Sequence, residues 1–365
     1  MKFRSILLGS AATVLMGSAA QAADAVIAPE PEPVEYVRVC DVYGTSFYYI
    51  PGTEICLKVG GYLRYDIGVG DLLGDIGDDG DETYYKRGRF QLRLDARTET
   101  ELGTLRGYAA INLSYATTSA NPIDTNGDGI NDDFDDSHSA KDSESIEHAY
   151  VELGGFRVGV TDSYFVTFSD YAGNIIYDDL IPFGPYTTHQ IAYTFDAGNG
   201  FTIGGAVEEG SDDEPFGQAI NDYAPHAVLG ASYQAGLFAL YAVGGYDSNE
   251  EEFSVKGRVD VKPTDMISLF VMGAWTDDDD DNGGNYYAQW GGDWGLWTGA
   301  TVKVSDRIAI NGQFSYNELE DYAAVLDANF TVVPGFVVTP GVAYQHFDDI
   351  DDEAWGGYLR TQFTF

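Results

Sequence analysis

The sequence has few basic residues and few long apolar runs. Its 365 residues include 19 Lys and Arg against 59 Asp and Glu, a formal net charge of -40. Nucleic-acid binding needs clustered basic side chains, so this balance argues against it. After residue 22, no apolar stretch is long enough to cross a bilayer as a helix. If the chain spans a membrane, it must do so as a closed β-barrel, which satisfies every backbone polar group.

The N-terminus has the three parts of a secretory signal peptide. Residues 1–4 (MKFR) are basic, residues 5–19 are apolar and small, and residues 20–22 (AQA) form a cleavage signal. A transmembrane anchor is the alternative, but the run is short for a span and rich in Ala, Gly and Ser. We therefore expect residues 1–22 to be removed during export.

Cysteine is scarce, since the chain has only Cys40 and Cys56. An even number of closely spaced cysteines in an exported protein favours a disulfide over two free thiols. A disulfide closing a loop of about 15 residues contributes about 3 kcal/mol in the chain-entropy model. Residues 23–57, which include this pair, begin with a Pro- and Glu-rich stretch without periodicity. We interpret them as an extended N-terminal segment.

From residue 58 to residue 365 the sequence alternates polar and apolar residues. In the segment from Arg87 to Arg97, every odd residue is polar or charged and every even one is apolar or glycine. A soluble β-sandwich with its arginines in solvent could alternate in the same way. Repetition favours a barrel, because about 16 such segments follow one another and several have about ten residues. They lie near 58–69, 84–98, 103–116, 144–153, 156–162, 188–197, 200–209, 224–234, 237–246, 252–262, 266–276, 295–304, 306–318, 321–333, 336–346 and 354–365.

The connections between these segments alternate between short and long. Short turns occur at residues 198–200 and 263–265, whereas long acidic connections occur at residues 75–82 and 121–142. Short turns at one end and long loops at the other are typical of outer-membrane barrels. We therefore predict an all-β fold, a transmembrane antiparallel β-barrel of about 16 strands formed by residues 58–365.

Three N-terminal stretches also resemble a known family. Residues 29–41 (PEPEPVEYVRVCD), 48–58 (YYIPGTEICLK) and 60–66 (GGYLRYD) are similar to the start of alphaproteobacterial porins of the Brucella and rhizobial type. The remaining chain resembles that family mainly in its pattern. The resemblance implies a homotrimer of 16-stranded barrels in the outer membrane of a Gram-negative bacterium, in contact with lipid and lipopolysaccharide. It also implies that each barrel is narrowed by its third long loop.

We expect the lumen to be the functional site of a general-diffusion channel for small hydrophilic solutes and ions. The third long connection, residues 163–188, carries Asp170, Asp178 and Asp179. Folded inward, these acids would face basic residues, whereas in an external loop they would only be solvated. Acidic outer loops would then make the channel weakly cation-selective. By alternation, the arginines that point inward from the first five strands are Arg64, Arg87, Arg89, Arg93, Arg97, Arg106 and Arg157.

A separate motif lies in the acidic connection at residues 124–135 (DTNGDGINDDFD). Its oxygen ligands and its glycine are spaced as in the calcium loops of dockerins and thrombospondin repeats, although the last ligand is Asp rather than Glu. A generic acidic loop is the alternative. The sequence thus requires no cofactor and allows Ca²⁺ here. The candidate ligands are Asp124, Asn126, Asp128, Ile130, Asp132 and Asp135.

Other functional classes find less support. A barrel enzyme needs a nucleophile with a histidine partner, and the spacing of the five histidines indicates none. We therefore predict that the protein is not an enzyme. A siderophore-type transporter needs a folded plug, but only about 35 residues separate the signal peptide from the first strand. A structural or adhesive surface protein is the remaining alternative, and single-channel conductance would separate it from a pore.

Overall fold

The computed structural model describes residues 38–76, 82–118, 122–123, 133–134, 139–211, 218–277, 284–348 and 351–365. All of them belong to one compact unit, Val37–Phe365. Within these ranges, no helix has the length and apolar character needed to span a membrane. The calcium-ligand candidates of residues 124–135 and the predicted signal peptide lie outside the described residues.

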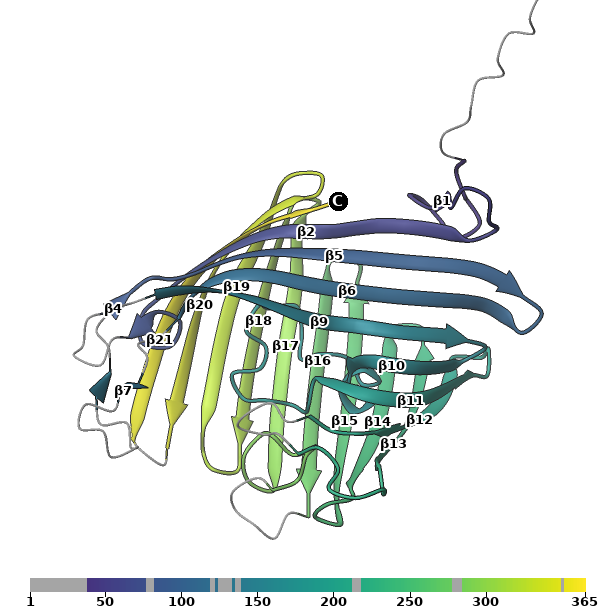
Figure 1. The fold of residues 1–365 in the computed structure, drawn as a ribbon. Helices are drawn as coiled ribbons and strands as arrows, with labels where there is room; N and C mark the ends of the chain where they lie inside the picture. The colour runs from purple at the N-terminus through teal and green to yellow at the C-terminus, as the bar shows by residue number, and fades with distance from the viewer. Residues whose placement is uncertain are drawn as a thin grey trace, which may run out of the picture. The chain divides into compact units, whose positions relative to one another are not determined.

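Sixteen antiparallel strands form a closed barrel (Figure 1). Each strand pairs with the next along the chain, and β21 pairs with β2 to close the ring. The predicted strand count is confirmed, and most boundaries agree within a few residues. The strands are β2 (Cys56–Val69), β5 (Tyr85–Thr100), β6 (Gly103–Thr118), β9 (Ser139–Leu153), β10 (Phe156–Asp162), β11 (Thr187–Asp196), β12 (Phe201–Glu208), β13 (His226–Ala235), β14 (Phe238–Asp247), β15 (Glu252–Thr264), β16 (Ile267–Thr276), β17 (Trp294–Ser305), β18 (Ile308–Asn317), β19 (Tyr322–Val333), β20 (Phe336–Phe347) and β21 (Asp352–Thr364).

Among the described residues, six short elements accompany the barrel. Strand β1 (Tyr48–Tyr49) pairs with the start of β2. The pairs β3 (Asp75–Ile76) with β4 (Glu82–Thr83) and β7 (Pro122–Ile123) with β8 (Asp133–Phe134) are two-residue ladders in long connections. A single helical turn, α1 (Tyr164–Thr167), follows β10.

The outer face of the barrel is apolar, as the alternation predicts. Side chains such as Leu229, Val271 and Val342 are exposed by 74%, 52% and 50% on strands whose alternate residues point inward. In a soluble sandwich these residues would be buried and the polar residues exposed. The reversed arrangement is the one that a hydrocarbon environment stabilises.

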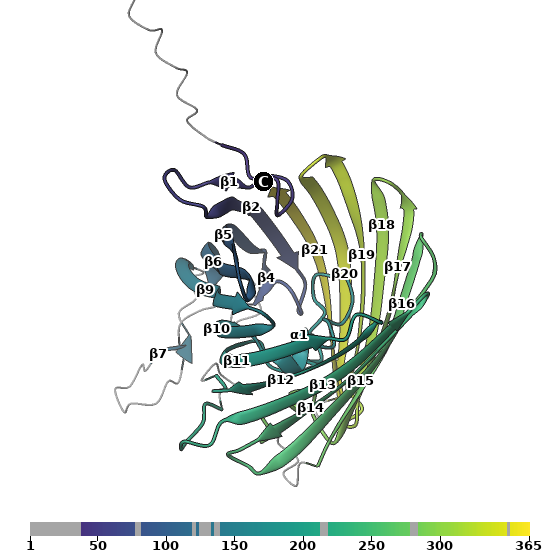
Figure 2. The ribbon, with the colours of Figure 1, turned by 90° about the vertical axis from the view of Figure 1, so that its right-hand side faces the viewer.

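The apolar core of the molecule lies inside the barrel. Helix α1 and the segment that follows it pack against the inner face of the strands, and Figure 2 shows α1 within the ring. Phe165 and Phe183 of this segment and Trp297 of β17 are almost completely buried. The prediction that the third long connection folds into the lumen is therefore confirmed.

The predicted disulfide between Cys40 and Cys56 is also present. Both cysteines are buried with Phe47, and they tie the segment around β1 to the first residue of β2. The constraint thus acts at the first residue of the first barrel strand, beside Arg97, whose guanidinium lies 5.2 Å from the ring centroid of Phe47.

Candidate functional site

The lumen is narrowed by residues 163–186, which connect β10 to β11 and are called the constriction loop below. Its first turn is fixed by Glu208 at the end of β12. Ser163 Oγ donates to one carboxylate oxygen of Glu208 at 2.7 Å, and the Tyr164 amide donates to the other at 2.6 Å. Tyr287 OH donates to the same carboxylate at 3.1 Å. Because Glu208 is only 1% exposed, these donors are what makes its burial tolerable.

The far part of the constriction loop is held by side chains from the opposite strands. Four donors reach the backbone carbonyl oxygens of residues 178–183, and Asp327 of β19 accepts from the Ile176 amide at 3.2 Å. We call strands β15 to β20 the loop-bearing wall. The wall thus supplies the hydrogen-bond donors that buried backbone carbonyls of the loop need. The four bonds run from Lys256 to Phe183 at 2.8 Å, Trp297 to Ile181 at 2.9 Å, Gln313 to Asp178 at 3.0 Å and Gln345 to Leu180 at 3.1 Å.

The seven predicted arginines share one face of β2, β5, β6, β9 and β10, which we call the basic wall. This is the inner face, because Arg64 lies opposite Gln362, on the face of β21 that carries Tyr358. Tyr358 in turn packs on Tyr177 of the constriction loop, with 5.0 Å between ring centroids. The side chains of Arg97, Arg106 and Arg157 line a cavity of about 450 Å³ together with Glu152 and Tyr164.

Four of these arginines are neutralised by carboxylates that the sequence analysis did not single out. Each acid bridges two arginines of the same face, so the charges form linked clusters rather than isolated pairs. Arg360 of β21 joins one of them and was also missed. The contacts are Asp66 with Arg87 at 2.7 Å and Arg360 at 2.6 Å, Asp95 with Arg97 at 2.7 Å and Arg106 at 3.0 Å, and Glu152 with Arg106 and Arg157, both at 2.9 Å.

The three predicted loop acids differ in their surroundings. The Asp170 side chain is 67% exposed and lies 3.9 Å from Arg258 of β15, outside the first five strands. Asp178 is half-buried, whereas Asp179 is exposed. Burial, with the neighbouring charge of Asp179, raises the pKa of Asp178 to about 7. Within the described residues, none of the three forms an ion pair with the basic wall, so their facing the arginines stays a prediction.

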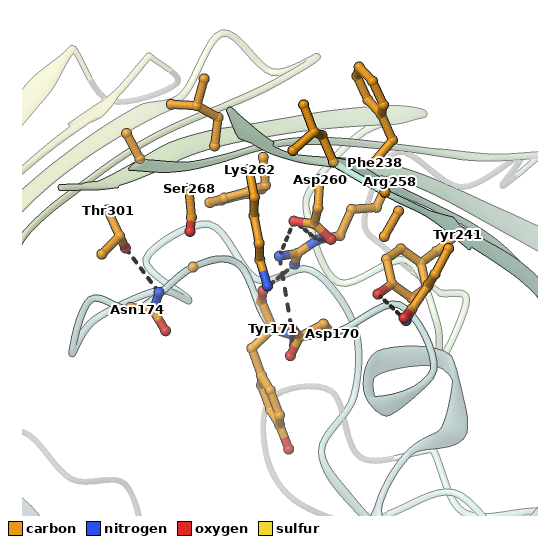
Figure 3. Close-up of a pocket in the computed structure, with 18 of the residues that line it drawn as sticks. Asp170, Tyr171, Asn174, Phe238, Tyr241, Arg258, Asp260, Lys262, Ser268 and Thr301 are labelled. Atoms are coloured by element: carbon orange, nitrogen blue, oxygen red, sulfur yellow. Dashed lines mark hydrogen bonds and ion pairs between the residues drawn. The ribbon is translucent and has the colours of Figure 1, made fainter. Parts of the chain in front are cut away.

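A second cavity, of about 630 Å³, lies between the constriction loop and the loop-bearing wall (Figure 3). Arg258 donates to Asp260 at 2.9 Å and to the Tyr171 carbonyl oxygen, and its guanidinium lies 4.6 Å from the ring of Phe270. Lys262 adds a second basic side chain to the same cavity. Basic and acidic groups thus alternate on this wall too.

The missed residues carried a readable signal. Lys256, Arg258 and Asp260 occupy alternate positions of one predicted strand. In the same way, Asp66 is two residues from Arg64, and Asp95 is two residues from Arg93 and Arg97. Extending the alternation to both signs of charge and to every strand would have placed them in the lumen. Among the described residues, no group of His, Cys, Asp and Glu is arranged to hold a metal ion.

Comparison with known proteins agrees with this architecture. Residues 24–363 match the porin subfamily. The chain is 41% identical, over the full length of both proteins, to porin Omp2a and to porin Omp2b of Brucella melitensis. It resembles the outer membrane channel DcaP of Acinetobacter baumannii with a TM-score of 0.61, at 17% identity over 87% of this chain and 99% of that one. The anion-selective porin from Comamonas acidovorans gives a TM-score of 0.55, at 12% identity over 86% of this chain and 100% of that one.

Proposed function

Because this chain belongs to the porin subfamily of outer-membrane channel proteins, we propose that it is a general-diffusion pore for small hydrophilic solutes and ions, with weak cation selectivity. The observation that supports this most is the closed barrel with a charged inner face and a loop bound inside it. Such a barrel keeps an aqueous path unless loops fill it. A passive path needs no catalytic group, so we also propose that the protein is not an enzyme.

The size limit of the pore would come from the constriction loop. Its hydrogen bonds to Lys256, Trp297 and Gln345 fix it against one wall, so solutes pass between the loop and the basic wall. Because the constriction loop is held at Ser163 and Tyr164 and again at residues 178–183, the opening beside it should keep a constant width. We therefore expect a sharp size cutoff rather than a broad one.

The weak cation preference would arise because the charges at the narrow section partly cancel. Asp66, Asp95 and Glu152 offset four arginines of the basic wall, and Asp170 of the constriction loop lies 3.9 Å from Arg258 of the loop-bearing wall. The excess of 59 acidic over 19 basic residues then acts in the vestibule. Charges beyond about 10 Å from the ion path are largely screened at 0.1 M salt, so the preference should grow as salt is lowered.

Two partners complete the proposal. The exposed apolar outer face suits contact with outer-membrane lipid, and the acidic long connections could share divalent cations with lipopolysaccharide phosphates. We also propose that the chain assembles as a homotrimer, as its resemblance to the porin family implies. Calcium binding by residues 124–135 is a separate proposal supported by the ligand spacing alone. Calorimetry should give a dissociation constant of roughly 0.1–1 mM, the range of extracellular modules, and none for Asp128→Ala.

Purified protein in liposomes and planar bilayers tests the channel function. Vesicles should admit small sugars and exclude large ones, and reversal potentials across a KCl gradient should indicate a modest preference for K⁺. Vesicles sealed to both sizes of sugar would refute the pore. An anion-selective reversal potential would leave the pore standing and refute the selectivity.

A further inference from the structure

Three arginines of the basic wall have only neutral hydrogen-bond partners among the residues that the structure describes. Each uses its Nε–H, and no bond from a terminal guanidinium nitrogen to another described residue is present. Their other donors are therefore available to a ligand in the lumen. The three bonds join Arg64 to Gln362 at 2.8 Å, Arg89 to Ser114 at 2.9 Å and Arg93 to Gln91.

These three arginines lie in the middle of the row of charged side chains along the basic wall, which we call the charge ladder. At both ends of this ladder the arginines are paired with carboxylates. Towards the long loops, Asp66 binds Arg87 and Arg360. Towards the short turns, Asp95 and Glu152 bind the other three arginines of the wall. The middle of the ladder thus carries uncompensated positive charge, between two clusters that carry little.

The positive charges in this gap are held close together. Arg64 and Arg89 are direct cross-strand partners, an arrangement that is destabilising for like charges. Tyr62 supports the group, because the guanidinium carbons of Arg64 and Arg93 lie 4.3 Å and 5.4 Å from its ring centroid. The ring is 4% exposed, whereas Arg93 is exposed and the other two arginines are half-buried. Cation–π contact orients the charges without neutralising them.

A chain of hydrogen bonds connects Arg93 to the carboxylate of Glu147 on β9, but Glu147 does not contact the guanidinium itself. Asn112 donates to Glu147, and its own Oδ1 accepts from Gln91 Nε2 at 2.9 Å. The Oε1 of Gln91 then accepts from Arg93. Two amides therefore separate Glu147 from Arg93, and they hold the Arg93 guanidinium in place while leaving its charge uncompensated.

We propose that Arg64, Arg89 and Arg93 form an oxyanion-binding site in the lumen, which takes the carboxylate or phosphate group of a small solute. A planar guanidinium binds such groups through two parallel hydrogen bonds, a geometry that chloride cannot use. The site rests on the proposed channel function and gives the pore a solute class, small organic acids and phosphates. It is compatible with weak K⁺ preference, because a local binding site and the net field act on different ions.

Single-channel recording in KCl with inorganic phosphate added to one side tests the site. Phosphate should reduce the current in a saturable way, and Arg89→Gln should weaken its apparent affinity about tenfold, as expected for one charge-assisted hydrogen bond. Arg157→Gln is the matched control, because it removes the same charge from the same wall but from a guanidinium already bound to Glu152. Its phosphate affinity should stay near that of the wild type. Malonate in place of phosphate tests whether a carboxylate is bound equally well.

The outcomes separate the site from the channel. Normal KCl current that neither phosphate nor malonate reduces would overturn the site and leave the pore intact. Equal weakening by Arg89→Gln and Arg157→Gln would also overturn it, because the general field of the wall would then explain the effect. Absence of KCl current would overturn the channel function, and the site with it. Arg64→Gln should match Arg89→Gln, and it gives a second reading if one variant assembles poorly.

Discussion

The basic wall and the loop-bearing wall face the same lumen but use their polar side chains differently. On the basic wall, carboxylates and guanidinium groups bind one another across neighbouring strands, and most of them keep some exposure. On the loop-bearing wall, Lys256 and Trp297 are nearly completely buried and donate to loop carbonyls. One wall keeps its charged groups partly exposed to the lumen, and the other holds the constriction loop in place.

Strand length follows the same division only in part, because β10 of the basic wall has 7 residues and β15 of the loop-bearing wall has 13. Strands β5 and β6 have 16 residues each and β9 has 15, whereas β16 and β18 have 10. Long strands provide more inward positions, and here these positions carry the ladder of charges. The short strands β16 and β18 present mainly small, apolar and amide side chains to the constriction loop, such as Ala274 and Gln313.

The largest effect should come from removing the hydrogen bonds that Glu208 accepts at the start of the constriction loop. Glu208→Ala leaves Ser163 Oγ, the Tyr164 amide and Tyr287 OH without their buried acceptor. Loss of hydrogen bonds to a buried charged group should lower the free energy of unfolding by about 3 kcal/mol or more. Thermal unfolding in detergent should show this, and single-channel current should become larger and noisier. The exposed neighbour Glu209, changed to Ala, is the control, and equal effects of both changes would refute this role of Glu208.

That division between walls was only partly predictable from the sequence. The barrel was, because alternation and turn length are local properties of the chain. The binding of the loop was not, because Trp297 and Ile181 are 116 residues apart and Gln345 and Leu180 are 165 apart. No local pattern marks such pairs, and only the family resemblance indicated an inward fold.

A pair of matched variants tests whether the two walls differ electrostatically. Asp66→Asn leaves Arg87 and Arg360 without their shared carboxylate, and their side chains are 22% and 15% exposed. The reversal potential should move clearly towards anions. Asp260→Asn removes the same charge from the other wall, but Arg258 is 5% exposed and still bound by the Tyr171 carbonyl, so the shift should be smaller. Equal shifts would mean that both walls line the ion path alike.

The loop acids provide a third test, because the proposed cation preference depends on them. The triple variant Asp170→Asn, Asp178→Asn, Asp179→Asn should lose the preference for K⁺, since it leaves the uncompensated arginines of the basic wall unopposed. Reversal potentials at low and high salt measure this, with the larger change at low salt. An unchanged potential would show that these aspartates lie away from the ion path.

The smallest effect is a pH dependence of the K⁺ preference, which the ionisation of Asp178 in the constriction loop should cause. Burial and the nearby Asp179 raise its pKa to about 7, so it is mostly neutral at pH 6 and mostly charged at pH 8. Deprotonation adds one negative charge beside the ion path, and therefore the preference for K⁺ should rise over this range.

Tyr171 and Tyr186 should not contribute, because burial raises the pKa of both phenols above their usual value and keeps them neutral. In Asp178→Asn the preference should stay near the wild-type value at pH 6 throughout. The Gln313 contact does not depend on this charge, because it is made to the Asp178 backbone carbonyl, so the loop should keep its position. A variant that retains the full pH response would refute this role of Asp178 and assign the response to another group.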